Sequence, residues 1–354
     1  MKGLILSGGK GTRLRPITHT SAKQLVPVAN RPVLFYGIEA MKDAGIDEVG
    51  IIVAPETGDE IRAVAGDGSA FGLAITYIEQ EAPLGLAHAV LTAEDYLDGS
   101  PFVMYLGDNL LRNGITDLVK TFSTDAPDAL ILLTPVADPE NYGVAELVDG
   151  RVSVLVEKPP APKTNLALVG VYMFTPAIFD AARSIEPSGR GELEITDAIQ
   201  TLVNSGKRVD PHIVHGWWKD TGQVQDMLEA NRLILDDLVE RIEGECIDSR
   251  VEGRVVIEKG ARLERSTVRG PVIVGAGSTI TDAYIGPYTA VGEDVTIAAA
   301  ELEYSIVLSG SSVRDLEYRI EASLIGRNVT IGRGPSLPRA YRFVVGDNSE
   351  ISIL

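Results

Sequence analysis

Residues 265–274 read RSTVRGPVIV, and their pattern decides how the C-terminal part of the chain folds. Two β-branched residues, Val268 and Val274, stand six positions apart. Four other stretches repeat this spacing, namely DSRVEGRVVI (248–257), DAYIGPYTAV (282–291), YSIVLSGSSV (304–313) and ASLIGRNVTI (322–331). An aliphatic residue at every sixth position is typical of hexapeptide repeats, which form a parallel β-helix.

The spacing between the stretches supports the same fold. Their first aliphatic residues, Val251, Val268, Ile285, Val307 and Ile325, follow one another at intervals of 17, 17, 22 and 18 residues. Three faces of six residues make a coil of about 18, so each aliphatic residue should stack on its counterpart one coil away. Antiparallel hairpins would not need this register. We predict a left-handed parallel β-helix over 245–354.

The preceding part of the chain alternates short apolar runs with helical patterns. The runs are GLIL (3–6), EVGIIVA (48–54), ITYIEQ (75–80), FVMYLGD (102–108), ALILLTPV (129–136) and ALVGVYMF (167–174). Strands that alternate with helices indicate βαβ units in a Rossmann-like, doubly wound and mostly parallel sheet. An amphipathic pattern over 222–244, stopped by Gly244, predicts a linking helix that closes a catalytic domain at 1–244.

The loop after the first run, SGGKGTRLRP (7–16), holds three glycines and three cations. It lacks the Gly-Lys-Ser/Thr end of a P-loop, and Leu14 occupies the third glycine position of a dinucleotide fingerprint. Glycines let backbone N–H groups approach an anion, while Lys10, Arg13 and Arg15 supply positive charge. The loop is therefore either a phosphate cradle or a glycine-rich turn with solvated charges.

Further motifs favour the cradle. They are KQLVPV (23–28), EQEAPLGLAHAV (79–90), YLGDN (105–109), NYGVAEL (141–147), VEKP (156–159), GRGELEITD (189–197) and GWWKDTG (216–222). In this order they resemble the sugar-1-phosphate nucleotidylyltransferases, and KQLVPV with a C-terminal β-helix is similar to the long glucose-1-phosphate thymidylyltransferases. The resemblance implies transfer of a nucleotidyl group from dTTP to α-D-glucose 1-phosphate, which yields dTDP-glucose and pyrophosphate.

The resemblance also implies roles for individual residues. The nucleotide would contact Leu6, Gly8, Gly9, Gly11, Thr12, Arg13, Gln80, Pro83, Gly85, Leu86 and Gly107. The sugar phosphate would contact Tyr142, Gly143, Glu157, Lys158, Val169, Gly170, Arg190 and Thr196. Catalysis would depend on Arg13, Lys23, Asp108, Lys158 and Asp220. Asp108 and Asp220 would bind Mg²⁺, which proteins commonly hold by one or two carboxylates plus substrate phosphates.

Several of these residues have an ordinary structural alternative. Asp108 could cap a helix, Lys23 could be a surface lysine, and Glu157 with Lys158 could be an exposed pair at a strand end. Trp217 and Trp218 could stack on the sugar or fill the core. No general base is expected, because a phosphate monoester with a second pKa near 6 is mostly dianionic at neutral pH.

The net charge and the cysteine content limit the kinds of binding partner to expect. A net charge of −18 disfavours nucleic acid and anionic membranes, so an anionic substrate needs a local cationic pocket. One cysteine, Cys246, excludes an intramolecular disulfide and favours the cytoplasm. The open ends and flat faces of a β-helix allow a homo-oligomer.

Three alternative functions stay open at this point. The enzyme could use UTP or another sugar 1-phosphate, because thymine and uracil differ by one methyl group. It could be a catalytically inactive regulatory relative. It could transfer acyl groups with its β-helix, although all four histidines, His19, His88, His212 and His215, precede that domain.

Overall fold

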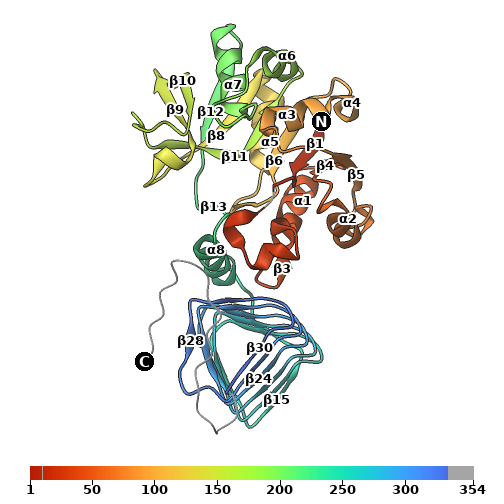
Figure 1. The fold of residues 1–354 in the computed structure, drawn as a ribbon, viewed down its shortest axis with the longest axis vertical. Coiled ribbons are helices and arrows are strands. Elements are labelled where there is room, and N and C mark those ends of the chain that lie inside the picture. Colours follow the sequence, from red (N-terminus) through yellow and green to blue (C-terminus); the bar gives the residue numbers. More distant parts are fainter. Residues whose placement is uncertain (10, 334–354) are drawn as a thin grey trace. The chain divides into compact units, whose positions relative to one another are not determined.

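The chain divides into two compact units, Met1–Asp237 and Leu238–Leu354. The computed structural model describes residues 1–9 and 11–333 of them (Figure 1). Within these residues, no helix combines the length and the apolar character needed to cross a membrane. Lys10 lies outside the described residues.

The N-terminal unit is built on a nine-stranded sheet. Its strands are β1 (Lys2–Leu6), β4 (Glu48–Val53), β5 (Ala74–Glu79), β6 (Phe102–Leu106), β8 (Ala129–Pro135), β9 (Gly143–Val148), β10 (Arg151–Glu157), β11 (Leu166–Phe174) and β12 (Val209–Ile213). All six predicted apolar runs form strands of this sheet. The pairings make β10 and β11 run opposite to the other strands, so the sheet is mostly parallel, as predicted.

Helices cover both faces of the sheet because the central strands are apolar on both sides. Along β1, Leu4 and Leu6 pack into one core cluster and Ile5 into the other. Residues of α1 (Val33–Asp43), α2 (Gly58–Ala65) and α5 (Thr116–Asp125) join the cluster around Ile5. Residues of α3 (Leu86–Thr92), α4 (Glu94–Leu97), α6 (Ala177–Ser184) and α7 (Ile195–Asn204) join the other. This two-sided packing is that of a doubly wound Rossmann-like fold.

The sheet places several loops at one edge. Leu6 at the end of β1 is level with Leu106 on β6 and with Ile52 on β4. The loops that follow these parallel strands therefore leave the same edge, where ligands bind in open α/β sheets. Next to this edge, the register of β11 against β8 shifts between Leu168 and Tyr172. Such irregularities are common beside active sites, where they change the direction in which side chains point.

The helix predicted over 222–244 is shorter than expected. Helix α8 spans Val224–Asp236, and Arg241–Ile242 already form strand β14 of the second unit. Ile242 pairs with Ile257, as a repeat residue does. Asp236 and Asp237 end the helix, where the partial negative charge of the last carbonyls disfavours acidic residues. The helix therefore ends before Gly244, because the residues of β14 pair with β17 instead of continuing the helix.

The second unit forms a left-handed parallel β-helix as far as the described residues reach, and its coils stack in Figure 1. This confirms the predicted fold, while residues 334–354 of the predicted range lie outside the described residues. Three sheets form its faces. The first contains β14 (Arg241–Ile242), β17 (Val255–Ile257), β20 (Val272–Val274), β23 (Thr289–Val291), β26 (Ile306–Val307) and β29 (Leu324–Ile325). The second contains β15 (Glu245–Ile247), β18 (Arg262–Glu264), β21 (Thr279–Thr281), β24 (Thr296–Ala298), β27 (Ser312–Arg314) and β30 (Thr330–Gly332). The third contains β16 (Arg250–Glu252), β19 (Thr267–Arg269), β22 (Tyr284–Ile285), β25 (Glu301–Glu303) and β28 (Ile320–Glu321).

The predicted stacking is correct for three stretches and shifted by one face for the other two. Ile285 stacks on Leu302, not on Val307. Val307 instead pairs with Val291 and Ile325, on the first face. The interval of 22 residues thus spans one coil plus part of a further face. The error arose because Leu302 is also aliphatic but lies in a stretch, ELEYS, that lacks the glycine of the others.

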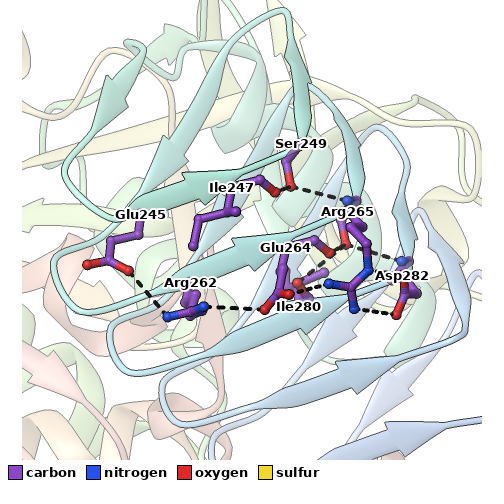
Figure 2. A network of polar contacts seen from close by, with 10 residues as sticks. Glu245, Ile247, Ser249, Arg262, Glu264, Arg265, Ile280 and Asp282 are labelled. Carbon is purple, nitrogen blue, oxygen red and sulfur yellow. Dashed lines mark hydrogen bonds and ion pairs between the residues drawn. The ribbon is translucent and has the colours of Figure 1, made fainter.

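Polar contacts join successive coils on the outside of the β-helix (Figure 2). Arg265 reaches Asp282 on the next coil with Nε and Nη2, both at 2.8 Å, and Arg262 lies 3.6 Å from Glu245 on the previous one. Inside a corner, the hydroxyl of Ser266 accepts a hydrogen bond from the Ala283 N–H at 3.1 Å. These contacts satisfy polar groups that the stacked aliphatic residues cannot.

Candidate active site

Two adjoining cavities open where the parallel strands of the first unit end. The smaller has a volume of about 210 Å³ and the larger of about 730 Å³. Leu86, Leu106 and Glu192 line both, so the cavities share a wall. A substrate pair could occupy them side by side.

The predicted nucleotide residues divide between the two cavities. The smaller is lined by Leu6, Gly8, Gly9, Gln80, Pro83, Gly85 and Leu86. Thr12 and Arg13 line the larger. Gly11 and Gly107 line neither. A Cβ on Gly107 would lie 2.6 Å from the Ser7 hydroxyl, so this glycine permits close packing of two strand ends.

The glycine-rich loop packs directly on Lys23. Gly11 has a φ of 60°, and a Cβ there would lie 2.9 Å from the Lys23 Cβ. A Cβ on Gly9 would lie 3.0 Å from the Lys23 Cε. Glycine is therefore needed at Gly11 both for its left-handed backbone and for space. The loop can approach an anion together with a lysine ammonium group, as the cradle reading requires.

Gln80 is oriented by two neighbours. Its Nε2 donates to the Gly85 carbonyl at 3.2 Å and to His88 Nδ1 at 2.9 Å. Both amide hydrogens are thus used, which leaves Oε1 as the group available to a ligand in the smaller cavity. An amide oxygen accepts hydrogen bonds, so it fits a base edge that carries an N–H donor.

Gln24 is a cavity residue to which the sequence gave no role. It is 1 % exposed, lines the smaller cavity, and its Oε1 has no hydrogen-bond partner among the described residues. A buried acceptor without a partner is costly unless a ligand supplies the donor. Its place directly after Lys23 was the available signal.

Asp108 and Lys23 form a buried ion pair. Burial by itself would raise the pKa of the Asp108 carboxyl, but the Lys23 ammonium outweighs it and holds that pKa below its usual range. Burial by itself would lower the pKa of Lys23, and Asp108 reverses this and raises it. Both side chains are therefore charged at neutral pH. Asp108 is not the helix cap, and Lys23 is not the surface lysine, that the sequence left open.

Asp220 lies near this pair, but nearby positive charges stabilise its carboxylate less than Lys23 stabilises that of Asp108. It belongs to β13 (Trp218–Asp220), which pairs with β7 (Asn109–Leu111) so that Asp220 is level with Asn109. Burial, and next the charge of Asp108, raise the pKa of Asp220 to about 6, against the opposing charges of Lys23 and Arg13. Its Oδ1 is buried without a hydrogen-bond partner among the described residues.

This arrangement fits a divalent cation. An orphaned carboxylate oxygen next to a second buried carboxylate is a pair of hard oxygen donors. Among the described residues, no group of three or more acidic, histidine or cysteine side chains is placed to hold a metal. Two carboxylates without a third protein ligand leave coordination positions for substrate oxygens. Such an open site is the kind that Mg²⁺ usually occupies, in contrast to a site closed by protein ligands.

Asn109 connects the carboxylates to the larger cavity. Its Nδ2 donates to Asp108 Oδ1 at 3.1 Å. Its Oδ1 accepts from Trp218 Nε1 at 2.6 Å and from the Gly170 N–H at 3.3 Å. Trp218 lines the larger cavity and packs edge-on against Tyr142, with ring centroids 5.6 Å apart. Asn109 lies in the YLGDN motif, but the sequence gave it no role.

Glu157 is a hydrogen-bonded acceptor in the larger cavity. Thr196 donates its hydroxyl to Glu157 Oε2 at 2.7 Å, and Arg190 Nη2 donates to Oε1 at 3.1 Å. Arg190 also binds Glu194 Oε1 at 2.8 Å. Lys158 Nζ lies 3.9 Å from Glu157 Oε1. Arg190 and Thr196 therefore hold Glu157 in place.

Most predicted sugar-phosphate residues line the larger cavity. They are Tyr142, Gly143, Glu157, Lys158, Gly170, Arg190 and Thr196, and Asp220 lines it too. Val169 differs, because its side chain is fully buried in the core around Ile5. The alternation of β11 turns it away from the cavity, so only its backbone could reach a ligand. None of the four histidines lines either cavity within the described residues.

Comparisons with known proteins agree with this geometry. The family model described as nucleotidyl transferase matches residues 2–237. The chain belongs to the nucleotidyl transferase family. A glucose-1-phosphate thymidylyltransferase of Streptomyces antibioticus is 58 % identical over 100 % of this chain and 99 % of its own. The low-salt glycan biosynthesis nucleotidyltransferase Agl11 of Haloferax volcanii is 49 % identical over 100 % of both chains.

Solved structures agree as well. A putative glucose-1-phosphate thymidylyltransferase from Bacillus anthracis, crystallised with a sucrose, superposes with a TM-score of 0.64 at 34 % identity. The match covers 68 % of this chain and 98 % of that one. The predicted family and fold are thus confirmed.

In this nucleotidyl transferase, Gly222 makes room for Arg13. A Cβ on Gly222 would lie 2.7 Å from Arg13 Nη2 and 3.2 Å from Asp220 Oδ1. Gly222→Ala should therefore displace the flexible guanidinium while the fold tolerates the change. We expect kcat to fall about tenfold or more, since small misplacements of catalytic groups are costly. Steady-state kinetics and thermal melting would measure the two effects.

Gly189→Ala provides the matched control, because a Cβ there would meet nothing within 4 Å. It should leave kcat within a factor of two to three, as surface substitutions do. Wild-type kcat in Gly222→Ala would mean that the position of Arg13 does not limit the reaction.

Proposed function

We propose that the enzyme transfers the thymidylyl group of dTTP to α-D-glucose 1-phosphate, with release of pyrophosphate. The observation that carries this proposal is the pair of adjoining cavities. The small one presents Gln80, and the large one presents Glu157 and Lys158. Asp108 lines the first and Asp220 the second, next to each other in the fold. The printed name of the Streptomyces antibioticus relative supports the choice of substrates.

The smaller cavity would bind the base. Its volume of about 210 Å³ is large enough for one nucleobase. With both Nε2 hydrogens of Gln80 in use, Oε1 can accept a hydrogen bond from N3–H of thymine or uracil. Cytosine presents an acceptor at N3 and would be repelled. The cradle of Gly8, Gly9 and Gly11 with Lys23 would hold the phosphates.

The larger cavity would bind glucose 1-phosphate. Glu157, held by Arg190 and Thr196, offers carboxylate oxygens to sugar hydroxyls. A Cβ on Gly143 would lie 3.0 Å from Glu157 Oε2, so this glycine keeps the carboxylate accessible. Lys158 would bind the sugar phosphate. Tyr142 and Trp218 provide an aromatic wall.

The reaction would need alignment and charge stabilisation more than proton transfer. A phosphate oxygen of the sugar attacks the α-phosphorus, and pyrophosphate leaves from the opposite side. The attacking phosphate is already ionised, which agrees with cavities that no described histidine lines. Lys158 would hold this nucleophile, Lys23 the nucleotide phosphates, and Arg13 the charge that develops on the leaving group.

Mg²⁺ is the cofactor that we propose, with Asp108 and Asp220 as its protein ligands. When bound, it would neutralise negative charge that develops on the phosphate oxygens. Because Asp108 lines the smaller cavity and Asp220 the larger, a cation held by both would lie between the two cavities. Lys23 keeps Asp108 ionised before any cation binds.

The nucleotide preference tests the proposal. Rates with dTTP, UTP, CTP, ATP and GTP against glucose 1-phosphate should fall in the order dTTP, UTP, then the others. UTP lacks the 5-methyl group of dTTP and carries an additional 2′-hydroxyl. The methyl group alone should favour dTTP by about 10–200-fold, and CTP should be more than about 10²-fold below UTP. Gln80→Leu should reduce the difference between UTP and CTP. Equal rates with CTP and UTP would contradict the assigned role of Gln80.

The same assay separates the alternatives. Preferred use of UTP, or of another sugar 1-phosphate, would keep the chemistry and change the substrate. No pyrophosphate release with any pair would favour an inactive regulatory relative. Sugar-dependent thiol release from an acyl-CoA would establish acyl transfer, which a β-helix without histidine disfavours.

We also propose a cytoplasmic enzyme that acts on small molecules without nucleic acid or membrane partners. The charge of −18 and the single cysteine support this. The open ends of the β-helix allow self-association, which analytical ultracentrifugation would measure. We further propose that 1–244 holds all of the chemistry and that 245–354 holds none.

A further inference from the structure

Thr221 makes a double contact with the backbone of Asp108. Its backbone N–H donates to the Asp108 carbonyl at 2.9 Å, and its hydroxyl donates to the same oxygen at 2.8 Å. Thr221 is 1 % exposed, and Asp108 is 8 % exposed. The hydroxyl contact is therefore shielded from water, where a hydrogen bond is hard to replace.

This contact lies beside the paired strands β13 and β7, next to both aspartates. Asp220 immediately precedes Thr221, and Asp220 is level with Asn109, which immediately follows Asp108. Strand β13 has only three residues, Trp218–Asp220, so its pairing with β7 contributes little to holding the strands together. Two buried carboxylates also repel each other. A further attachment is needed to keep them close.

We infer that Thr221 is a positioning residue that fixes the separation of Asp108 and Asp220 so that both can bind one divalent cation. The inference rests on the metal role proposed for these two aspartates. Thr221 lines neither cavity, so its hydroxyl is not placed to bind the cation itself. It acts through the backbone of Asp108 and through its own bond to Asp220.

The chain contains a matched control for this contact. Thr175 donates its N–H to the Asp128 carbonyl at 2.9 Å and its hydroxyl to the same oxygen at 3.2 Å. Asp128 immediately precedes β8 and Thr175 immediately follows β11, at the opposite edge of the sheet from Asp108. Thr175 lines neither cavity. Loss of its hydroxyl removes the same kind of hydrogen bond far from the carboxylates.

The test is a Mn²⁺ titration of the full-length protein, followed by EPR of the free ion, with dTDP-glucose present and a protein-free blank. Thr221→Val should raise the Kd for Mn²⁺ about tenfold or more, in the range found when residues that orient metal ligands are lost. Thr221→Ser should restore most of the affinity. Thr175→Val should leave the Kd unchanged, although each valine variant removes a hydrogen bond and should lower the melting temperature.

Each outcome decides the matter. Wild-type Mn²⁺ affinity in Thr221→Val, or an equal loss in Thr175→Val, would overturn the inference. If Thr221→Val does not fold, Thr221→Ala carries the same expectation. Asp220→Asn separates the two proposals. If Asp220→Asn binds Mn²⁺ normally, the proposed metal site is wrong; if it loses Mn²⁺ while Thr221→Val does not, only the role of Thr221 is wrong.

Discussion

Asp220→Asn should lower kcat by about 10³-fold, because a metal-held charge contributes several kcal/mol to the transition state and each 1.36 kcal/mol is tenfold in rate. The substitution keeps the shape of the side chain and removes its charge. Stability should be unchanged or slightly higher, since burial and Asp108 already disfavour the charged form of Asp220 and raise its pKa to about 6. Steady-state kinetics at saturating Mg²⁺ and thermal melting would measure both effects.

Asp226→Asn is the control for this prediction. Asp226 lines the same cavity and its pKa is also raised, first by burial, but it is not one of the proposed ligands. Its kcat should fall less than tenfold. Asp108→Asn is a less clean test, because it would leave Lys23 buried without its partner and so destabilise the fold. Wild-type turnover of Asp220→Asn at limiting Mg²⁺ would exclude Asp220 as a ligand.

Arg13→Lys should lower kcat by about 10²-fold, although the charge is kept. Arginine presents a planar fork that can hold two phosphate oxygens, whereas lysine presents a single point charge. Arg13 lines the larger cavity, and Gly222 leaves space for its guanidinium beside Asp220. A lysine ammonium would neither fill that space nor reach two oxygens at once.

The loss should fall mainly on kcat, because additional negative charge develops on the leaving pyrophosphate as the transition state is reached and is absent there in the bound substrate. Initial rates over a range of dTTP concentrations would separate kcat from KM. An effect confined to KM would show that Arg13 contributes only to ground-state binding. If the variant is as active as the wild type, the backbone N–H groups of the loop, not Arg13, hold the phosphates.

The site divides into residues that motifs could indicate and residues that only contacts reveal. Asp108 follows a buried strand, and a carboxylate there needs a partner, so its special role could be predicted from sequence. Its partner could not, because Lys23 is remote in sequence and meets Asp108 only in the folded chain. Asn109 and Thr221 were missed for the same reason, whereas Gln24 was missed although it directly follows Lys23.

Two sequence predictions changed meaning in the structure. Arg190 and Thr196 hold Glu157 through hydrogen bonds, an arrangement that depends on the approach of α7 to the end of β10. Val169 points into the core, because the strand alternation near the β11 irregularity decides which side chains face the cavity. A motif gives the order of residues along the chain but not the face on which each side chain lies.

The sequence by itself determined the two architectures. Aliphatic residues at every sixth position bury their side chains by stacking in a β-helix. Alternating strands and helices bury theirs by packing the helices on both faces of a sheet. It also predicted a local phosphate-binding loop, since three cations and three glycines lie together at 7–16 of an acidic chain. The tertiary structure alone decided which coil Val307 joins and how close Asp220 lies to Asp108. Both depend on pairing between segments that are distant in sequence, and that pairing is set by the free energy of the whole fold.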